Sequence, residues 1–164
     1  IQSIQFPKAI FPIATTWSAF TRYFASFLVL LPFLWIYHIE FTWNVLWLPV
    51  VVAVQVVFTL GFCILCSVIG VYLQDLENIL SFGLKFWFYL SPAILDISLH
   101  VPKKYWIFFH INPFSSLFNS YKNVLIFGEP PVHYLIWTFL LGVVLLLVSL
   151  RIVAKLDHKI AKDV

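Results

Sequence analysis

"WLPVVVAVQVVFTLGFCILCSVIGV", residues 47–71, contains no charged side chain and only one strongly polar one, Gln55. A helix rises about 1.5 Å per residue, so this stretch is long enough to cross the roughly 30 Å hydrocarbon layer of a bilayer. An open sheet would leave backbone N–H and C=O groups unpaired in lipid, whereas a helix satisfies them internally. The segment therefore predicts a transmembrane helix, and an all-α polytopic membrane protein around it.

The composition of the whole chain supports this class. Of the 164 residues, 62% are hydrophobic and 10% are charged, whereas soluble domains are roughly 45–50% apolar. Together with the block above, three further apolar blocks predict a single transmembrane domain, residues 1–164, with about four spans at 14–39, 47–71, 79–95 and 134–154. The chain begins at Ile1, and we expect it to be truncated at its N-terminus.

Basic residues give the predicted orientation. Lys8 precedes the first span, and a basic run follows the last one at Arg151, Lys155, Lys159 and Lys162. Cytoplasmic flanks of membrane spans carry an excess of Lys and Arg, so we place both termini and the 71–78 corner in the cytoplasm. The formal net charge of +3 lies mostly in the C-terminal run, which is typical of a flank facing anionic lipid. No nucleic-acid partner is expected.

The corner between the second and third spans holds much of the scarce polarity of the chain. "GVYLQDLENI", residues 70–79, places four polar side chains within five positions: Gln74, Asp75, Glu77 and Asn78. One interpretation is a tight, solvated turn in which Asp75 caps the next helix. The other is a docking site for a partner protein. The residues alone leave both open.

The outer segment, residues 96–133, is predicted to be re-entrant or interfacial. Its two apolar pieces, "YWIFFHI" at 105–111 and "FSSLFNSYKNVLIF" at 114–127, are too short to span, because 14 helical residues cover only about 21 Å. Asn112 as N-cap, Pro113 at the first helical position and Gly128 just past the end indicate a helix.

This outer helix is predicted to be amphipathic. At 100° per residue, one face holds Phe114, Leu117, Phe118, Tyr121 and Leu125. The other face, expected to meet water, holds Ser115, Ser116, Asn119, Lys122 and Asn123. A helix lying on the membrane and a gate dipping into a pore fit this periodicity equally well.

The search for catalytic, cofactor-binding or metal-binding motifs is negative, so we do not expect an enzyme. The chain has no Gly-rich phosphate loop, zinc-protease helix or nucleophile elbow. Cys63 and Cys66 lie inside a span, where packing is the favoured role. No carboxylate lies at mid-span, which weakens secondary transport. Snorkelling to the interface is the favoured interpretation for Arg22 and Lys85, and a helix-to-helix hydrogen bond for Gln55.

Three stretches carry a resemblance to a known family. "FPKAIFPIA" (6–14), "YLQDLENILSFGLKFWFYLSPAIL" (72–95) and "INPFSSLFNSYKNVLIFGEPP" (111–131) occur in matching order along the chain. They resemble the membrane subunit of ABC-2 type exporters, in the branch for polysaccharides and polyol phosphates that includes O-antigen, capsule and teichoic acid permeases.

The resemblance implies a six-span permease that forms a homodimeric pore, of which this chain looks like the last four spans. A separate ATPase subunit would bind ATP and Mg²⁺ and contact the loops that map onto residues 6–13 and 72–78. The implied contact residues are Phe6, Pro7, Lys8, Tyr72, Gln74, Asp75, Glu77 and Asn78. The implied outer gate comprises Asn112, Pro113, Phe114, Phe118, Tyr121 and Lys122.

This sequence departs from the family pattern at a few positions. Gln74 stands where a basic residue commonly precedes the aspartate, and Lys8 and Lys122 stand where Arg is common. Any ion pair assigned to position 74 is therefore in doubt.

The function implied by the resemblance is export of a lipid-linked polysaccharide or polyol phosphate polymer across a bacterial cytoplasmic (inner) membrane, driven by ATP in the partner chain. The expected partners are the ATPase subunit, a second copy of the chain, the lipid-linked glycan and membrane lipid. Two other classes stay open: a non-transporting membrane scaffold, and a small membrane enzyme that acts on lipid-linked sugars. The lack of paired acid and base groups weighs against the enzyme.

Overall fold

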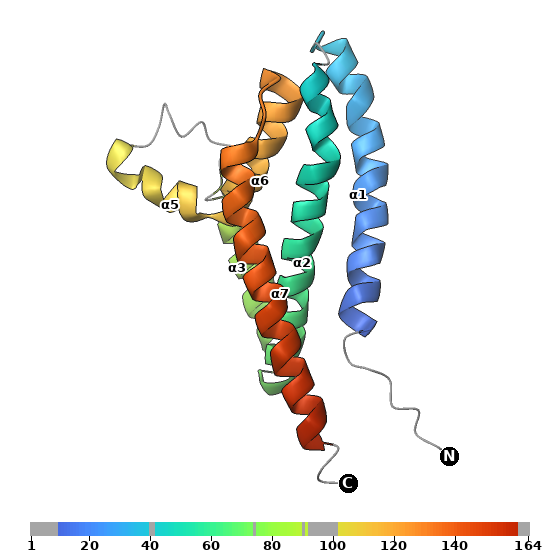
Figure 1. The fold of residues 1–164 in the computed structure, drawn as a ribbon, viewed down its shortest axis with the longest axis vertical. Helices are drawn as coiled ribbons and strands as arrows, with labels where there is room; N and C mark the ends of the chain where they lie inside the picture. Colours follow the sequence, from blue (N-terminus) through green and yellow to red (C-terminus); the bar gives the residue numbers. More distant parts are fainter. Residues whose placement is uncertain (1–9, 40–41, 74, 90, 92–101, 161–164) are drawn as a thin grey trace.

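The computed structural model describes residues 10–39, 42–73, 75–89, 91 and 102–160, and this part of the chain contains helices and no strand. Figure 1 shows the helices as an elongated bundle with a short arm at one side. In chain order the elements are α1 (Ile10–Ile36), η1 (Trp43–Trp47), α2 (Leu48–Tyr72), α3 (Leu76–Tyr89), η2 (Lys103–Tyr105), α5 (Trp106–Ile111), α6 (Pro113–Lys122), η3 (Asn123–Phe127) and α7 (Val132–Ile160).

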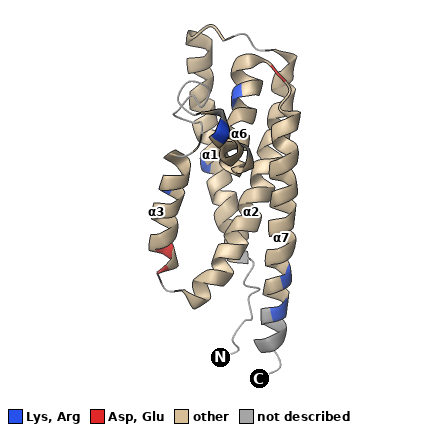
Figure 2. Ribbon diagram, turned by 90° about the vertical axis from the view of Figure 1, so that its left-hand side faces the viewer, with Lys and Arg blue, Asp and Glu red and all other residues tan. Residues whose placement is uncertain are grey.

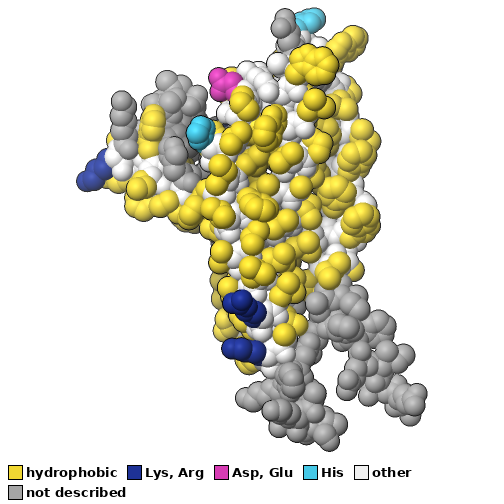
Figure 3. Space-filling model, in the orientation of Figure 1, with side chains coloured by type: hydrophobic (Ala, Val, Ile, Leu, Met, Phe, Trp, Pro, Cys, Tyr) yellow, Lys and Arg dark blue, Asp and Glu magenta, His cyan; other side chains and the backbone are white. Residues whose placement is uncertain are grey.

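Three helical segments of the described chain are long and apolar enough to cross a membrane. They cover Phe11–Ile36, Trp43–Tyr72 and Val132–Lys155, and they match the first, second and fourth predicted spans. Figure 3 shows a surface dominated by hydrophobic side chains, with basic side chains gathered toward the lower end of α7. The prediction of an all-α polytopic membrane protein is confirmed.

The third predicted span differs from the helix that the structure describes. Helix α3 has 14 residues, Leu76–Tyr89, and so starts three residues before the predicted boundary. At about 1.5 Å per residue it covers only about 21 Å, which is too short to cross the hydrocarbon alone. Residues 90 and 92–95 of the predicted span lie outside the described residues. The described chain therefore provides three helices of spanning length, compared with the four that were predicted.

The central helix pair is α2 and α7, which pack closely where two glycines face each other. A Cβ atom added at Gly61 would lie 2.7 Å from the Leu146 backbone nitrogen and 3.1 Å from the Gly142 carbonyl oxygen. A Cβ atom at Gly142 would lie 3.0 Å from the Phe58 Cα. Small residues let helix backbones approach closely in lipid, where association depends on van der Waals packing.

The core lies beside this crossing and joins four elements. Its buried side chains come from α2, α6, η3 and α7: Val51, Val54, Phe58, Leu117, Val124 and Leu135. Helix α1 contacts mainly α2, and most of its surface is uncovered. Only 6% of its most apolar stretch is buried. Most of α1 is therefore available to lipid or to other protein.

The polar ends of the helices are divided between the two ends of the bundle. The start of α1, the end of α7 and the corner between α2 and α3 lie at one end of the bundle (Figure 1). Figure 2 shows acidic residues at that corner and basic residues on the neighbouring end of α7. Arg151 is exposed on this part of α7, as is Lys155. The α1–α2 turn and the end of η3 lie at the opposite end.

Candidate functional site

In the predicted outer segment, α5 and α6 form a helical hairpin in which α5 is the arm at the side of the bundle and α6 packs against α2 and α7 (Figure 1). Asn112 is the turn between the two helices. The next residues pack against the middle of α2, because the Phe114 ring lies edge-on to Phe58 with centroids 6.0 Å apart. Trp87 of α3 packs against the same ring at 5.1 Å. We call this unit the α5–α6 hairpin (residues 106–122), and its tip reaches the level of mid-α2 (Figure 1).

The residues predicted to start and end this helix are confirmed at both ends. The Asn112 side chain accepts a hydrogen bond from the Phe114 backbone N–H at 3.0 Å, and Pro113 occupies the first helical position. At the far end, one turn of π-helix, η3, is closed by Gly128 with φ 63°. The Gly128 N–H donates to the Asn123 carbonyl oxygen. Such a left-handed residue at a helix end favours glycine, since other side chains are strained there.

The prediction that the polar face of α6 meets water is wrong for its serines. Ser115 is 1% exposed, and Ser116 and Ser120 are equally enclosed. The Ser116 hydroxyl donates to the Tyr134 carbonyl oxygen of α7, and Ser120 donates to the Ser116 carbonyl oxygen at 2.8 Å. The polar face packs against α7 because these short side chains allow close approach, and the hydroxyls of Ser116 and Ser120 find backbone acceptors, whereas the buried Ser115 hydroxyl has no hydrogen-bond partner among the described residues. This packing favours the inserted hairpin over a helix that lies on the membrane.

A polar cluster joins the hairpin to two long helices. The Tyr121 hydroxyl of α6 donates to Oε1 of Gln55 in α2 at 2.5 Å. The Tyr121 ring also packs against Tyr23 of α1, with ring centroids 6.3 Å apart. The interpretation of Gln55 as a helix-to-helix contact is borne out.

Two further hydrogen bonds hold the hairpin and the η3 turn that follows it. The carbonyl oxygen of Gly128 accepts a hydrogen bond from the Asn44 side chain at 2.5 Å. A Cβ atom at Gly128 would lie 2.6 Å from the Thr42 hydroxyl oxygen. At the turn between α5 and α6, the Trp137 indole N–H donates to the Ile111 carbonyl oxygen at 2.9 Å. The α1–α2 turn and α7 therefore both fix the hairpin.

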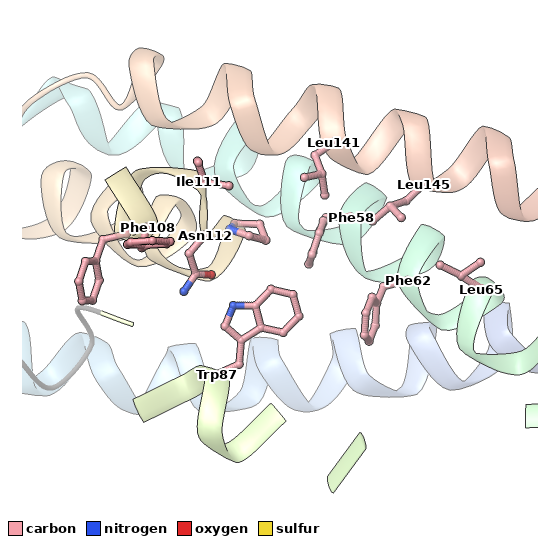
Figure 4. A pocket seen from close by; sticks show the side chains of 11 residues that line it. Phe58, Phe62, Leu65, Trp87, Phe108, Ile111, Asn112, Leu141 and Leu145 are labelled. Carbon is pink, nitrogen blue, oxygen red and sulfur yellow. The ribbon is translucent and has the colours of Figure 1, made fainter. Parts of the chain in front are cut away.

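An open cavity of about 510 Å³ lies beside the hairpin tip. Figure 4 shows the Trp87 indole and the Asn112 amide reaching into it between α2, α3 and α7. The wall is otherwise apolar and comprises Phe58, Phe62, Leu65, Phe108, Phe109, Ile111, Pro113, Leu141 and Leu145. Such a lining suits hydrocarbon or the apolar faces of sugar rings. No sequence pattern marks Trp87 or Phe58 as site residues, since only the fold brings α2 and α3 to the hairpin.

The predicted ATPase contacts lie partly outside the described residues, which include neither Phe6, Pro7 and Lys8 nor Gln74. At the corner, Tyr72, Asp75, Glu77 and Asn78 are all exposed. The Asp75 backbone carbonyl accepts from the Ile79 N–H at 3.2 Å, but its carboxylate makes no hydrogen bond or ion pair to another described residue. The corner thus presents free carboxylates beside exposed Val71 and Tyr72.

The structure brings most of the predicted gate residues together. Asn112, Pro113 and Phe114 form the hairpin tip, and Phe114 shares the cluster with Trp87. Phe118 packs against Phe88 of α3, with ring centroids 5.8 Å apart. Lys122, at the end of α6, is partly buried. Among the described residues no group of three His, Cys, Asp or Glu side chains is placed to hold a metal ion.

Comparison with curated proteins finds relatives that share one description, "O-antigen export system permease protein RfbA". One from Klebsiella pneumoniae is 29% identical over 164 residues, covering 99% of this chain and 62% of the relative. A second from the same organism is 28% identical with the same coverage. A relative from Myxococcus xanthus is 27% identical over 129 residues, covering 76% of this chain and 48% of its own.

This chain spans about 62% of the length of the K. pneumoniae relatives. No protein-family model matches it. No solved structure matches it. Over nearly its whole length the chain is thus similar to O-antigen export permeases, and the resemblance to ABC-2 exporter membrane subunits that its motifs indicate is confirmed.

Proposed function

We propose that this chain is the membrane subunit of an ATP-driven exporter that moves a lipid-linked polysaccharide or polyol phosphate polymer across a bacterial inner membrane. The observation that carries the proposal is the similarity to O-antigen export permeases along 99% of the chain. The three helices of spanning length and the inserted hairpin support a transport role. In this proposal two copies form the pore and both termini of each copy lie in the cytoplasm.

In this proposal the ATPase subunit transmits its ATP-driven movement to the corner between α2 and α3. This chain has no phosphate-binding loop, so ATP and Mg²⁺ are bound by a separate ATPase subunit. In this proposal the exposed carboxylates of Asp75 and Glu77 and the exposed Tyr72 ring form part of its docking surface. Phe6, Pro7, Lys8, Gln74 and Asn78 complete the proposed surface. Movement of the partner on ATP binding displaces the corner and tilts the attached helices.

The α5–α6 hairpin acts as the outer gate. Its tip residues, Asn112 to Phe114, lie at mid-α2, and the tip contacts the aromatic ring of Trp87 on α3. Because α3 follows the corner directly, a tilt of α3 changes this contact. The gate therefore responds to the partner through α3, while the polymer passes aromatic side chains that pack against its sugar rings.

The test is transport of a lipid-linked glycan into vesicles. The full protein is reconstituted with its partner ATPase, and uptake is measured with ATP, with a non-hydrolysable ATP analogue, and without the partner. We expect uptake only with ATP and both subunits. Uptake that is equal with and without ATP contradicts the proposal, as does failure of the two subunits to copurify.

A further inference from the structure

A buried threonine of α7 lacks the hydrogen bond that its position on the helix offers. Thr138 is 0% exposed, and its hydroxyl makes no hydrogen bond to any described residue. A threonine hydroxyl on a helix can rotate to donate to the carbonyl oxygen three or four residues earlier. Four residues before Thr138 that oxygen belongs to Tyr134. A buried hydroxyl without a partner is costly, so the missing bond needs a reason.

Other hydroxyls on the described helices do make this bond. Thr16 donates to the Pro12 carbonyl oxygen at 2.8 Å, and Ser149, also on α7, donates to the Leu146 carbonyl oxygen at 3.0 Å. The same kind of bond is made by Thr15, Thr21, Ser26, Ser81 and Ser120. The difference at Thr138 therefore lies in what its acceptor already binds.

The Tyr134 carbonyl oxygen is occupied by the hairpin. A carbonyl oxygen has two lone pairs. Within α7 this oxygen accepts the backbone N–H of Thr138, as in any regular helix. The Ser116 hydroxyl of α6 donates to it as well. These two donors leave no lone pair for the Thr138 hydroxyl, so Ser116 takes the place that the threonine would fill on its own helix.

Ser116 has an alternative acceptor within α6. The Asn112 carbonyl oxygen lies four residues earlier and accepts the Ser116 backbone N–H at 3.1 Å. The Ser116 hydroxyl can rotate toward this oxygen, as the Ser120 hydroxyl does toward the Ser116 carbonyl oxygen. Thr138 could then donate to Tyr134, and both hydroxyls would be bonded. Ser116 is 3% exposed and Thr138 is 0% exposed, so this exchange takes place among groups that this chain itself encloses.

We propose that Ser116, Tyr134 and Thr138 form a hydrogen-bond latch between α6 and α7 that has two states. In the latched state Ser116 donates to Tyr134, and packing of α6 against α7 offsets the unpartnered threonine. In the released state Thr138 donates to Tyr134, Ser116 donates to Asn112, and α6 has lost its hydroxyl bond to α7. The inference rests on the proposed function, because release of the latch is the step that frees the α5–α6 hairpin to move as a gate.

A double-mutant cycle on the full-length protein in detergent tests the latch without transport. Ser116→Ala removes the bond to α7, but Thr138 can then donate to Tyr134, so the melting temperature should fall little. In a Thr138→Val background no hydroxyl replaces Ser116, and the same substitution should lower the melting temperature by about 2–4 °C more. Equal effects of Ser116→Ala in the two backgrounds overturn the proposal.

Ser149→Ala is the matched control for the cycle. It removes another buried hydroxyl of α7, one whose bond to the Leu146 carbonyl oxygen does not involve the hairpin. Its effect on the melting temperature should therefore be the same with Thr138 and with Thr138→Val, because independent sites are additive.

Transport by threonine variants tests the link to the gate. Thr138→Val cannot form the released state, so ATP-dependent glycan uptake should fall at least about threefold at normal protein level, with unchanged copurification of the ATPase subunit. Thr138→Ser keeps the hydroxyl and should restore uptake, whereas a role in packing alone would not be rescued by a residue that lacks the methyl group. Ser149→Ala should transport normally.

The outcomes separate this inference from the proposed function. Normal uptake by Thr138→Val, or no rescue by Thr138→Ser, overturns the inference alone. Absence of ATP-dependent uptake by the wild type overturns the proposed function, and the melting temperatures of the double-mutant cycle then decide whether the latch exists.

Discussion

The hydroxyl of Tyr121 and the side-chain oxygen of Gln55 are 2.5 Å apart, and this hydrogen bond ties the inserted hairpin to the middle of a membrane-spanning helix. Hydrogen bonds between helices in a bilayer contribute about 0.6 kcal/mol on average and about 1.7 kcal/mol at most. The contact therefore positions α6 more than it stabilises the fold.

Tyr121→Phe should lower the free energy of unfolding in detergent by about 0.5–1.5 kcal/mol, because Gln55 loses its donor. Tyr89→Phe, on an exposed ring of α3, is the control and should change little. A double-mutant cycle with Gln55→Leu measures the coupling. Additive effects of the two substitutions would show that the hydrogen bond does not contribute.

Gly61→Ala should destabilise the protein by about 1–3 kcal/mol, since the new methyl group would collide with backbone atoms of α7. Backbone atoms cannot move aside as the end of a flexible side chain can. Gly83→Ala is the matched control, because nothing lies within 4 Å of its added Cβ. That control should be neutral or slightly stabilising through helix propensity. Thermal unfolding of both variants in the same detergent checks the pair, and equal melting temperatures would contradict the close crossing.

Gly128→Ala should also destabilise, by about 1–2 kcal/mol from the left-handed backbone conformation alone. The collision with Thr42 adds to this cost. Thr42→Gly in the same chain should restore part of the loss, because it removes the colliding side chain but not the backbone strain. The measurement is thermal stability of the single and double variants. Gly70→Ala, whose added Cβ would meet only a side-chain methyl group at 3.6 Å, is the control.

Glu77→Lys should weaken binding of the ATPase subunit by about threefold to tenfold, since it reverses one exposed charge at the proposed docking corner. Asp75→Ala should act in the same direction with a smaller effect. Export and ATPase coupling should fall while folding and protein level stay normal. Glu129→Lys makes the same reversal at the other end of the bundle and should leave binding unchanged. Normal binding and export by Glu77→Lys would remove the corner from the docking surface.

The parts of the fold that follow from local rules could be predicted from the sequence. Apolar runs match three helices of spanning length because the thickness of hydrocarbon fixes their size. Asn112, Pro113 and Gly128 mark the ends of the hairpin helix through backbone chemistry that involves only their neighbours.

What depends on distant segments could not be predicted. Periodicity separates the serine face of α6 from its aromatic face, but it does not show whether Ser115 and Ser116 meet water or another backbone. The approach of α7 decides that question, and it buries both serines. The role of Trp87 likewise depends on where α3 lies relative to the hairpin tip.

The contact of Gly128 with Thr42 and Asn44 has a mechanical consequence. The turn at Gly128, which follows the hairpin, is hydrogen-bonded to the loop that joins the first two long helices, so we expect the turn and the loop to move together. A movement that displaces the Gly128 turn must therefore either displace the α1–α2 loop as well or break the hydrogen bond between Asn44 and Gly128.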